Sequence, residues 1–305
     1  VDACLQRILR ESPNAGPERF AILGFGKLGG NELNYSSDID LLAIYEPDPE
    51  ADPGAERTAY TAVMTQLNRD LTAHTLQGYL YRVDLRLRPF GSSGMLVYPV
   101  SAAVDYYHRQ AAAWERQAAI KLGAVAGNRE LAGRFLAAVH ESIPRRVEPQ
   151  AVTDNIRKLR EQKTRAVELD PNVVDVKEGR GGIRDIEFLV QGLQLLDVAR
   201  SASEADAADS GRGTERPWLE GNTLAAIDSL AARGIIDEES AAHLREDYVF
   251  LRKAEHVLQI AADRQVNSLR LAAEHTEVVA RRMQQAQNIT EDFWPRLSQT
   301  LERAH

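Results

Sequence analysis

An apolar run that opens with two aspartates constrains this chain more than any other feature; residues 24–45 read GFGKLGGNELNYSSDIDLLAIY. Side chains alternate across a β-strand, so Asp38 and Asp40 would lie on one face, about 7 Å apart. At an effective dielectric constant of about 20, their repulsion costs roughly 2 kcal/mol before any desolvation. A bound divalent cation would offset this cost, so we predict that both aspartates are metal ligands.

The segment before the aspartates carries a glycine and a lysine where a strand ends. RFAILGFG (19–26) is predicted to be a strand, and it runs into Gly26 and Lys27. Glycine lets a backbone approach a phosphate closely, amides at a helix start favour anions, and lysine adds a positive charge. The residue order is neither the G-x-x-x-x-G-K-S/T phosphate loop nor the G-x-G-x-x-G dinucleotide motif. We expect Gly26, Lys27 and Ser37 to line a nucleotide or phosphate site.

A third acidic residue lies in a later segment with strict two-residue alternation, GYLYRVDLRLRPFG (78–91). The alternation predicts a strand that the closing proline and glycine end. Its polar face would carry Leu80, Arg82, Asp84, Arg86 and Arg88. Asp84 would complete the carboxylates of a two-metal site for in-line displacement at phosphorus. Arg86 and Arg88 would bind phosphate oxygens through their planar guanidinium groups.

Each of these patterns also has a structural explanation. Asp38, which follows two serines, could cap a turn, and the arginine-rich face could be a solvated ladder paired with acids. The conjunction of a glycine turn, an aspartate pair and a third aspartate on a later strand is more specific than any single pattern. The conjunction favours chemistry at phosphate.

The first 125 residues mix predicted strands and helices, whereas the remainder is predicted to be nearly all helical. A strand at 38–45, a helix near 57–76, a strand at 95–99 and a helix near 100–121 complete the first part. After residue 127, apolar residues recur at helical spacing in segments near 128–142, 150–168, 183–199, 218–233, 237–262, 272–287 and 290–304. The polar segment 200–217 is predicted to be a mobile loop.

Charge and hydropathy limit the partners of this chain. It has 305 residues, with 37 basic and 45 acidic side chains and a net charge of −8. Proteins that bind nucleic acid through phosphate contacts usually carry a basic excess, so we expect no nucleic-acid partner. No apolar run approaches 18 residues, so we expect no membrane partner either.

The cysteine count and the first residues suggest the context of the chain. Cys4 is its only cysteine, which fits a reducing cytoplasm. The chain starts with valine, and Val1, Leu5, Ile8 and Leu9 are spaced like the last turns of an amphipathic helix. We therefore expect a piece of a longer protein, and no signal peptide is visible.

Four motifs resemble one known family: GKLGGNELNYSSDIDL, YRVDLRLRPFGSSG, DYYHRQAAAWERQAAIKLGAVAG and GRGGIRDIEFLVQGLQLL. They are similar, in the same order, to the bifunctional glutamine synthetase adenylyltransferase/adenylyl-removing enzymes. The resemblance covers residues 20 to about 200 and continues more loosely beyond. It implies an α+β fold, with a polymerase-β-type nucleotidyltransferase domain (a small mixed sheet with helices) over 1–125 and an all-helical bundle domain over 126–305. It also implies Mg²⁺ bound by Asp38, Asp40 and Asp84.

The phrase RGGIRDIEF resembles the amino-terminal, adenylyl-removing half of that family more than the transferase half. This implies phosphorolysis of adenylyl-tyrosine to ADP, with glutamine synthetase as the protein substrate, ATP/ADP and phosphate as small-molecule partners, and a nitrogen-signalling regulatory protein as a further partner. One alternative is the transferase half, which moves AMP from ATP to the tyrosine. A second is a non-catalytic docking module for glutamine synthetase or a signalling protein, although such a module has no reason to keep three carboxylates.

The same phrase predicts a helix that two glycines precede. Arg184, Glu187 and Gln191 would share one face of this helix, and Arg184 and Glu187 could reach the catalytic cleft. The alternative is a surface charge cluster that includes Asp185. In the first domain, Trp114 is predicted to be a core residue, and Arg116 and Lys121 are predicted to lie near phosphate.

Overall fold

The computed structural model describes residues 1–12, 14–76, 78–144, 147–167, 172–207, 218–270, 274–287 and 293–305. It divides into two compact units. The first comprises Val1–Leu33, Ser37–Val147 and Val198–Asn222, and the second comprises Asn34–Ser36, Glu148–Asp197 and Thr223–His305. In these parts of the chain, no helix is both long enough and apolar enough to cross a membrane.

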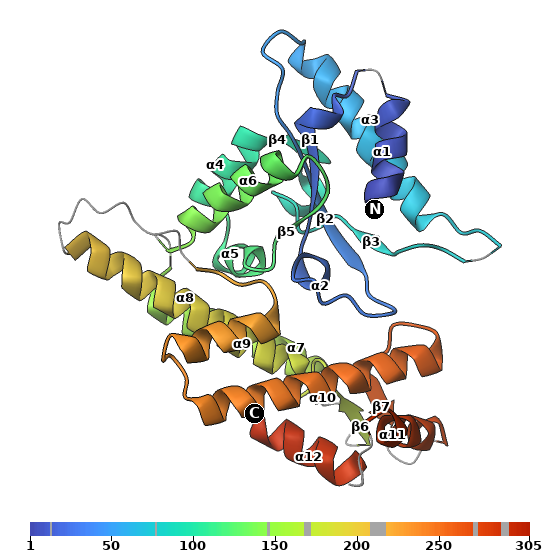
Figure 1. Cartoon of the computed structure of the whole chain (residues 1–305), viewed down its shortest axis with the longest axis vertical. Coiled ribbons are helices and arrows are strands. Elements are labelled where there is room, and N and C mark those ends of the chain that lie inside the picture. Colours follow the sequence, from blue (N-terminus) through green and yellow to red (C-terminus); the bar gives the residue numbers. More distant parts are fainter. Residues whose placement is uncertain are drawn as a thin grey trace. The chain divides into compact units, whose positions relative to one another are not determined.

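A mixed β-sheet forms the centre of the first unit (Figure 1). Its strands are β1 (Phe20–Gly24), β2 (Ile39–Tyr45), β3 (Val83–Asp84), β4 (Val97–Pro99) and β5 (Gly123–Gly127). Strand β1 is antiparallel to β2 and to β5. Both β3 and β4 run parallel to the other edge of β2, β3 opposite its first residues and β4 opposite its last. The chain therefore leaves the sheet after β3 and returns at β4, and the intervening loop, residues 85–96, lies at this edge.

Helices cover both faces of the sheet. Helices α1 (Asp2–Arg10) and α3 (Pro53–Thr72) lie on one side of it, and α4 (Val100–Arg109) and α6 (Arg129–Ser142) lie on the other (Figure 1). The short helices α2 (Gly26–Gly29) and α5 (Ala113–Ala119) contact or adjoin the strand ends. Because β2 is covered on both faces and paired on both edges, its sequence is an almost continuous apolar run.

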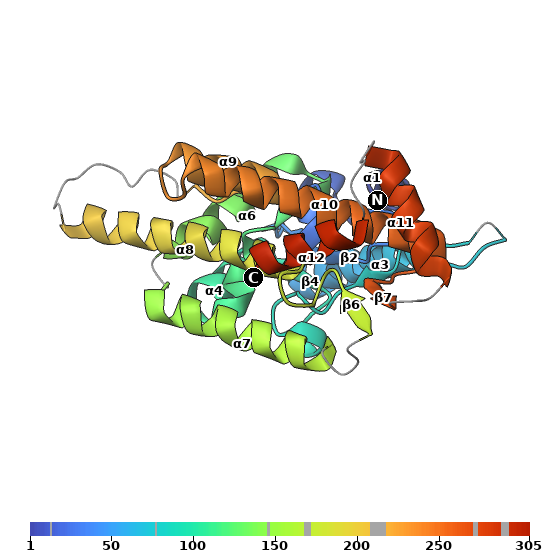
Figure 2. The same ribbon diagram turned by 90° about the horizontal axis from the view of Figure 1, so that it is seen from below.

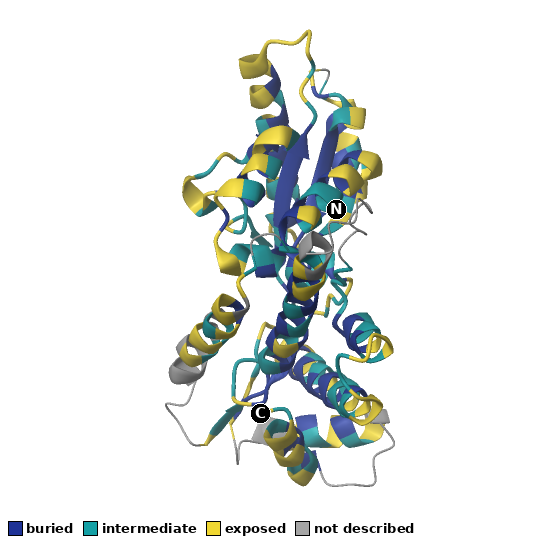
Figure 3. Ribbon diagram, turned by 90° about the vertical axis from the view of Figure 1, so that its left-hand side faces the viewer, coloured by how far each residue is buried: buried dark blue, intermediate teal, exposed yellow. Residues whose placement is uncertain are grey.

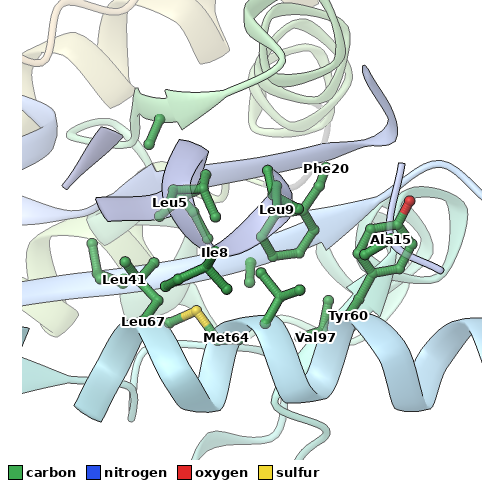
Figure 4. Packing of buried hydrophobic residues seen from close by; sticks show 14 of the residues in the cluster. Leu5, Ile8, Leu9, Ala15, Phe20, Leu41, Tyr60, Met64, Leu67 and Val97 are labelled. Carbon is green, nitrogen blue, oxygen red and sulfur yellow. The ribbon is translucent and has the colours of Figure 1, made fainter. Parts of the chain in front are cut away.

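The main core of this unit lies between the sheet and helices α1 and α3. Figure 4 shows Leu5, Ile8 and Leu9 of α1 packed near Met64 and Leu67 of α3, with side chains of β1, β2 and β4 between them. Alternate residues of the two long strands face this core, namely Phe20, Ile22, Ile39, Leu41, Ala43 and Tyr45. The alternation assigns Asp40 to the opposite face of β2.

The second unit is mainly helical. Its helices are α7 (Pro149–Val167), α8 (Ile183–Ala207, as far as Asp197 in this unit), α9 (Thr223–Ala232), α10 (Glu238–Ala262), α11 (Glu274–Gln287) and α12 (Phe293–Arg303). Helix α10 packs against α9, α11 and α12, and Figure 2 shows α9 and α10 side by side. In Figure 3 the helices of this unit carry buried residues along some faces and exposed residues along others.

The prediction that the second domain is all helical is wrong. Strands β6 (Val173–Asp175) and β7 (Ser268–Arg270) form an antiparallel pair. The Asp175 carboxylate accepts hydrogen bonds from the backbone N–H groups of Lys177 and Glu178 and from the Ser268 hydroxyl. Three-residue strands are too short for a periodic signal, so local sequence did not reveal them.

Several predicted boundaries also change. The strand predicted over 78–91 is confined to Val83–Asp84, because the residues that follow fold into turns. The helix predicted near 100–121 is two helices, α4 and α5, since the N–H groups of Gln110 and Ala111 both bond to the Tyr106 carbonyl and end the first. The small residues of β5 had not indicated a strand.

The end of the first unit and the predicted loop over 200–217 differ as well. Helix α6 groups with the sheet and extends the first unit to Val147, beyond the predicted boundary at 125, because it packs on β1, β5 and α4. Helix α8 continues to Ala207 through the first part of the predicted loop over 200–217. The rest of that predicted loop, 208–217, lies outside the described residues.

Candidate functional site

Two of the predicted acidic residues are neighbours at the edge of the sheet. Asp40 of β2 and Asp84 of β3 are register partners on parallel strands. The hydrogen bond from the Ile39 N–H to the Arg82 carbonyl, 2.9 Å long, fixes this register. Asp38 lies just before β2, so the residues predicted from two separate motifs meet at one place.

The glycine turn adjoins the same place. Gly26 has a left-handed backbone, with φ of 56°, and starts helix α2. A Cβ atom added at Gly26 would lie 3.7 Å from Oδ2 of Asp40, so this carboxylate stands beside the turn. Lys27 is half-buried and Ser37 is buried, at 9% exposure. The structure thus brings the glycine turn to the aspartates, as the sequence predicts.

Two arginines donate hydrogen bonds to the carboxylates of Asp38 and Asp84. The Arg82 Nε donates to Asp38, and an Arg82 Nη1 donates to the Tyr79 hydroxyl at 2.8 Å. Arg86 forms a fork with Asp84, in which Nε lies 3.0 Å from Oδ1 and Nη2 lies 2.5 Å from Oδ2, and its backbone N–H donates to Oδ1 at 2.8 Å. This geometry is the bidentate pairing that guanidinium groups make with carboxylates.

The charged groups of the site shift the pKa values of Asp84 and Arg86. Hydrogen bonds from Arg86 hold the pKa of Asp84 below its usual value, and their effect exceeds the opposing effect of burial. The hydrogen bond to Asp84 raises the pKa of Arg86, and the charges of Asp84, Asp40 and Asp38 add to this effect. All three predicted carboxylates therefore raise the pKa of Arg86, and Asp84 does so by direct contact.

The oxygen ligands of these residues suit Mg²⁺, which binds carboxylates in preference to nitrogen or sulfur ligands. In the arrangement observed, however, no group of three acidic, histidine or cysteine side chains among the described residues converges as a metal cage. Asp38 is turned toward Arg82 and Asp84 toward Arg86. The donor set fits the ion, provided that these arginines release their carboxylates when it binds.

Arg88, also predicted to bind phosphate, contacts the backbone of its own loop. Its guanidinium donates to backbone carbonyls of the loop 85–96, those of Leu85, Ser92, Gly94 and Met95. These contacts occupy its donors inside the protein. Of the two predicted phosphate-binding arginines, Arg86 is the exposed one, with 79% of its side chain accessible.

Sequence reasoning missed a buried ion pair behind the glycine turn. The Lys121 Nζ lies 2.6 Å from Oε2 of Glu32, and both side chains are less than a tenth exposed. Lys121 was predicted to lie near phosphate, but the structure pairs it with Glu32, which no motif had singled out. Arg116 donates to the Ala111 carbonyl, and Trp114, predicted to be in the core, is 43% exposed.

The glycine turn itself is tightly packed, which leads to a stability prediction. A Cβ atom at Gly29 would overlap the carbonyl oxygens of Gly24 and Lys121, whereas one at Gly133 of α6 would meet no atom within 4 Å. We expect Gly29→Ala to destabilise the fold by about 1–3 kcal/mol through overpacking. Gly133→Ala should stabilise it by up to about 1 kcal/mol, because alanine favours a helix. Urea unfolding of the two variants measures both changes, and equal shifts would contradict the close packing at Gly29.

Arg184 and Glu187 lie on α8 in the second unit. Arg184 donates to Oε1 of Glu178 at 2.7 Å and lies over the Phe188 ring. The Tyr248 hydroxyl donates to Glu187 at 3.5 Å. The helix begins where predicted, after Gly181, whose φ is 69°. The contribution of Arg184 and Glu187 to catalysis stays a prediction.

Comparison with known proteins indicates the class to which the chain belongs. Residues 1–138 match the family described as glutamate-ammonia ligase adenylyltransferase, and residues 150–305 match the one described as GlnD PII-uridylyltransferase. Both descriptions are of nucleotidyltransferases, and a mixed sheet with acidic residues on neighbouring strands suits that class. The chain is therefore of the nucleotidyltransferase class.

Curated relatives narrow the class to one family. The chain is 38% identical over 257 residues to the bifunctional glutamine synthetase adenylyltransferase/adenylyl-removing enzyme of Stenotrophomonas maltophilia strain R551-3, which covers 83% of the chain and 26% of the relative. It is 36% identical over 267 residues to the enzyme of the same name from Xanthomonas axonopodis pv. citri strain 306, covering 86% of the chain and 27% of the relative. Residues 1–138 of the chain belong to the glutamate-ammonia ligase adenylyltransferase family. It spans about a quarter of the length of these relatives.

Proposed function

We propose that the first unit is a polymerase-β-type catalytic domain that removes AMP from an adenylylated tyrosine of glutamine synthetase by Mg²⁺-dependent phosphorolysis. One observation carries the proposal. Asp40 and Asp84 are paired in register on parallel strands, and an exposed arginine forks onto the second of them. This arrangement supports the proposal, because carboxylates suit a cation and an exposed guanidinium suits a phosphate dianion.

The residues of the site have complementary roles in this reaction. Asp38, Asp40 and Asp84 would hold Mg²⁺, which when bound neutralises charge on the phosphoryl oxygens and the leaving group. Gly26 allows the backbone to approach a phosphate, because it carries no side chain. Arg86 would bind the incoming phosphate through two parallel N–H groups. An oxygen of that phosphate bonds to the AMP phosphorus while the bond to the tyrosine oxygen breaks, which yields ADP and, after protonation, free tyrosine.

Two alternatives remain alongside this proposal. A transferase would join the tyrosine oxygen to the α-phosphorus of ATP and release pyrophosphate. A docking module would bind glutamine synthetase without turning over any nucleotide. The match of residues 150–305 to a uridylyltransferase family adds UTP as a nucleotide to be compared with ATP. The preference for removal depends on the resemblance of RGGIRDIEF to the removing half and on Arg86 as a phosphate ligand.

The decisive experiment uses the chain with glutamine synthetase in both states. Adenylylated glutamine synthetase, Mg²⁺ and inorganic phosphate should yield ADP at a rate that saturates with phosphate. Unmodified glutamine synthetase with ATP or UTP should give little or no pyrophosphate. Labelling of the unmodified enzyme from ATP, without any requirement for phosphate, would instead identify the transferase. Binding without turnover in every arm would identify the docking module.

The partners and the cell compartment follow from the same proposal. Glutamine synthetase, ATP/ADP and phosphate are the proposed partners, and a nitrogen-signalling regulatory protein is a further one. We place the reaction in the cytoplasm. Arg184 and Glu187 would contribute from the second unit.

A conservative arginine substitution tests the phosphate contact. Arg86→Lys keeps a positive charge but removes the two-pronged donor. A hydrogen bond to a charged group is worth about 1.5–3 kcal/mol, so we expect the KM for phosphate to rise roughly 10- to 100-fold. Arg109→Lys is the control, because Arg109 lies on the exposed face of α4 with 75% of its side chain accessible. An unchanged KM in Arg86→Lys would remove Arg86 from the phosphate site.

A further inference from the structure

The loop 85–96, between β3 and β4, is folded around the guanidinium group of Arg88. Nε of Arg88 lies 3.0 Å from the Met95 carbonyl, and Nη2 lies 3.0 Å from that of Ser92 and 3.3 Å from that of Gly94. Nη1 donates to the Leu85 carbonyl. One side chain therefore joins the start of the loop to its end.

A buried tyrosine holds the same loop from the sheet side. The hydroxyl of Tyr98, in β4, donates to the Pro89 carbonyl at 2.7 Å and accepts from the Met95 N–H at 3.0 Å. Tyr98 is 2% exposed. A Cβ atom at Gly94 would overlap both the Pro89 carbonyl and the Tyr98 hydroxyl, so this packing requires a glycine.

The loop also contains a strained residue. Phe90 has a φ of 61°, in the left-handed region that large side chains rarely adopt, and Gly91 follows with a φ of 60°. A conformation of this kind costs on the order of 1–3 kcal/mol and persists only where surrounding contacts enforce it. Hydrogen bonds from the Gly91 N–H to the Arg88 carbonyl and from the Ser93 hydroxyl to the Phe90 carbonyl supply such contacts.

Arg88 contacts the part of the loop that lies next to Asp84 and Arg86 in the chain. Leu85, whose carbonyl accepts from Arg88, lies between Asp84 and Arg86 in the chain. The Arg86 N–H in turn donates to Asp84. A displacement of the Leu85 peptide would therefore move both members of the Asp84–Arg86 fork.

We propose that Arg88 is a positioning residue, which fixes Asp84 and Arg86 by clamping the loop 85–96 and does not itself bind phosphate. The inference rests on the proposed function and assigns to Arg88 a role distinct from that of Arg86. Groups that orient metal ligands through an intermediate contact typically change metal affinity or activity by about 10–100-fold when they are removed. A phosphate ligand would instead affect chiefly the KM for phosphate.

The test compares Arg88→Ala, Tyr98→Phe and the surface control Arg109→Ala. For Arg88→Ala we expect kcat to fall about 10- to 100-fold and Mn²⁺ binding, followed by electron paramagnetic resonance, to weaken about 10-fold or more. The KM for phosphate should rise less than in Arg86→Lys, because Arg86 is displaced but keeps both of its donors. Millimolar guanidinium ion should restore part of kcat, because it can bind the backbone carbonyls that Arg88 contacts in the parent chain. Tyr98→Phe should change the same quantities in the same direction by less, and Arg109→Ala should change none of them.

Each outcome decides the proposal. A raised KM for phosphate with unchanged kcat and Mn²⁺ affinity would make Arg88 a phosphate ligand and overturn the positioning role. If Arg88→Ala does not fold, Tyr98→Phe decides, and parental kcat and Mn²⁺ affinity in that variant would overturn the proposal. If the parent chain releases no ADP, the proposed function fails separately. In that case, Mn²⁺ affinity and the amide hydrogen exchange of residues 85–96 in Arg88→Ala still test the clamp. The proposal predicts weaker Mn²⁺ binding and faster exchange in this variant than in the parent chain.

Discussion

Asp40→Asn is expected to abolish release of ADP while the protein stays folded. The substitution preserves the shape of the side chain but removes one of the three negative charges that raise the pKa of Arg86. A metal ion contributes several kcal/mol of transition-state stabilisation, and each 1.4 kcal/mol is a tenfold change in rate, so the loss should reach about a thousandfold. Removing like-charge repulsion should leave stability unchanged or slightly increased.

Activity and circular dichroism measured on the same samples check this expectation. Asp38→Asn should also lose activity, since Asp38 is the other member of the pair predicted to hold the cation. For Asp38→Asn the free energy of unfolding is the more informative readout, because the substitution also weakens the hydrogen bond that Asp38 accepts from Arg82. Full activity in either variant, with a normal melting curve, would remove the metal-site hypothesis.

Asp84→Ala is expected to lower activity by several orders of magnitude, and Asp48→Ala should change it little. Asp84 is the register partner of Asp40 and accepts the Arg86 fork, so its removal takes away a proposed metal ligand and the charge that Arg86 pairs with in this structure. Asp48 lies in the loop before α3, where it pairs with Arg19 at 3.2 Å on the surface. Exposed ion pairs of this kind contribute about 0–1 kcal/mol.

The two aspartate variants form a matched pair, since both lose one carboxylate and one arginine contact. Initial rates of ADP release and urea unfolding curves for each would separate catalysis from stability. Comparable losses of activity in both would show that the reaction takes place elsewhere in the chain. A loss confined to Asp84→Ala would support the edge of β2 and β3 as the reaction site.

The candidate site could be predicted from the sequence because its features are local. A glycine at the end of a strand and two aspartates at the start of the next are visible within a segment of about 20 residues, and apolar periodicity indicates which elements flank them. The strands β1 and β2 and the start of α8 after Gly181 lie close to their predicted positions for this reason. The family resemblance was also carried by contiguous motifs.

The roles of the arginines could not be obtained in this way. Alternation over 78–91 predicted one long strand with Arg82, Asp84, Arg86 and Arg88 on one face. In the structure only Val83 and Asp84 pair with β2, because β4 takes the remaining part of that edge and the chain must leave the sheet between them. Arg88 then points its donors at the loop carbonyls and Arg86 forks onto Asp84.

The sequence by itself thus indicated the family, the mixed α/β character of the first part, the mainly helical character of the second and the candidate carboxylates. Tertiary structure alone decided that Asp84 pairs with Asp40, that Lys121 is neutralised by Glu32 across 89 positions of chain, and that Trp114 is exposed. The physical reason is the separation along the chain of the residues that interact. Periodicity and turn chemistry depend on neighbours within a few residues, whereas strand partners and buried ion pairs depend on which edges and faces the completed fold leaves available.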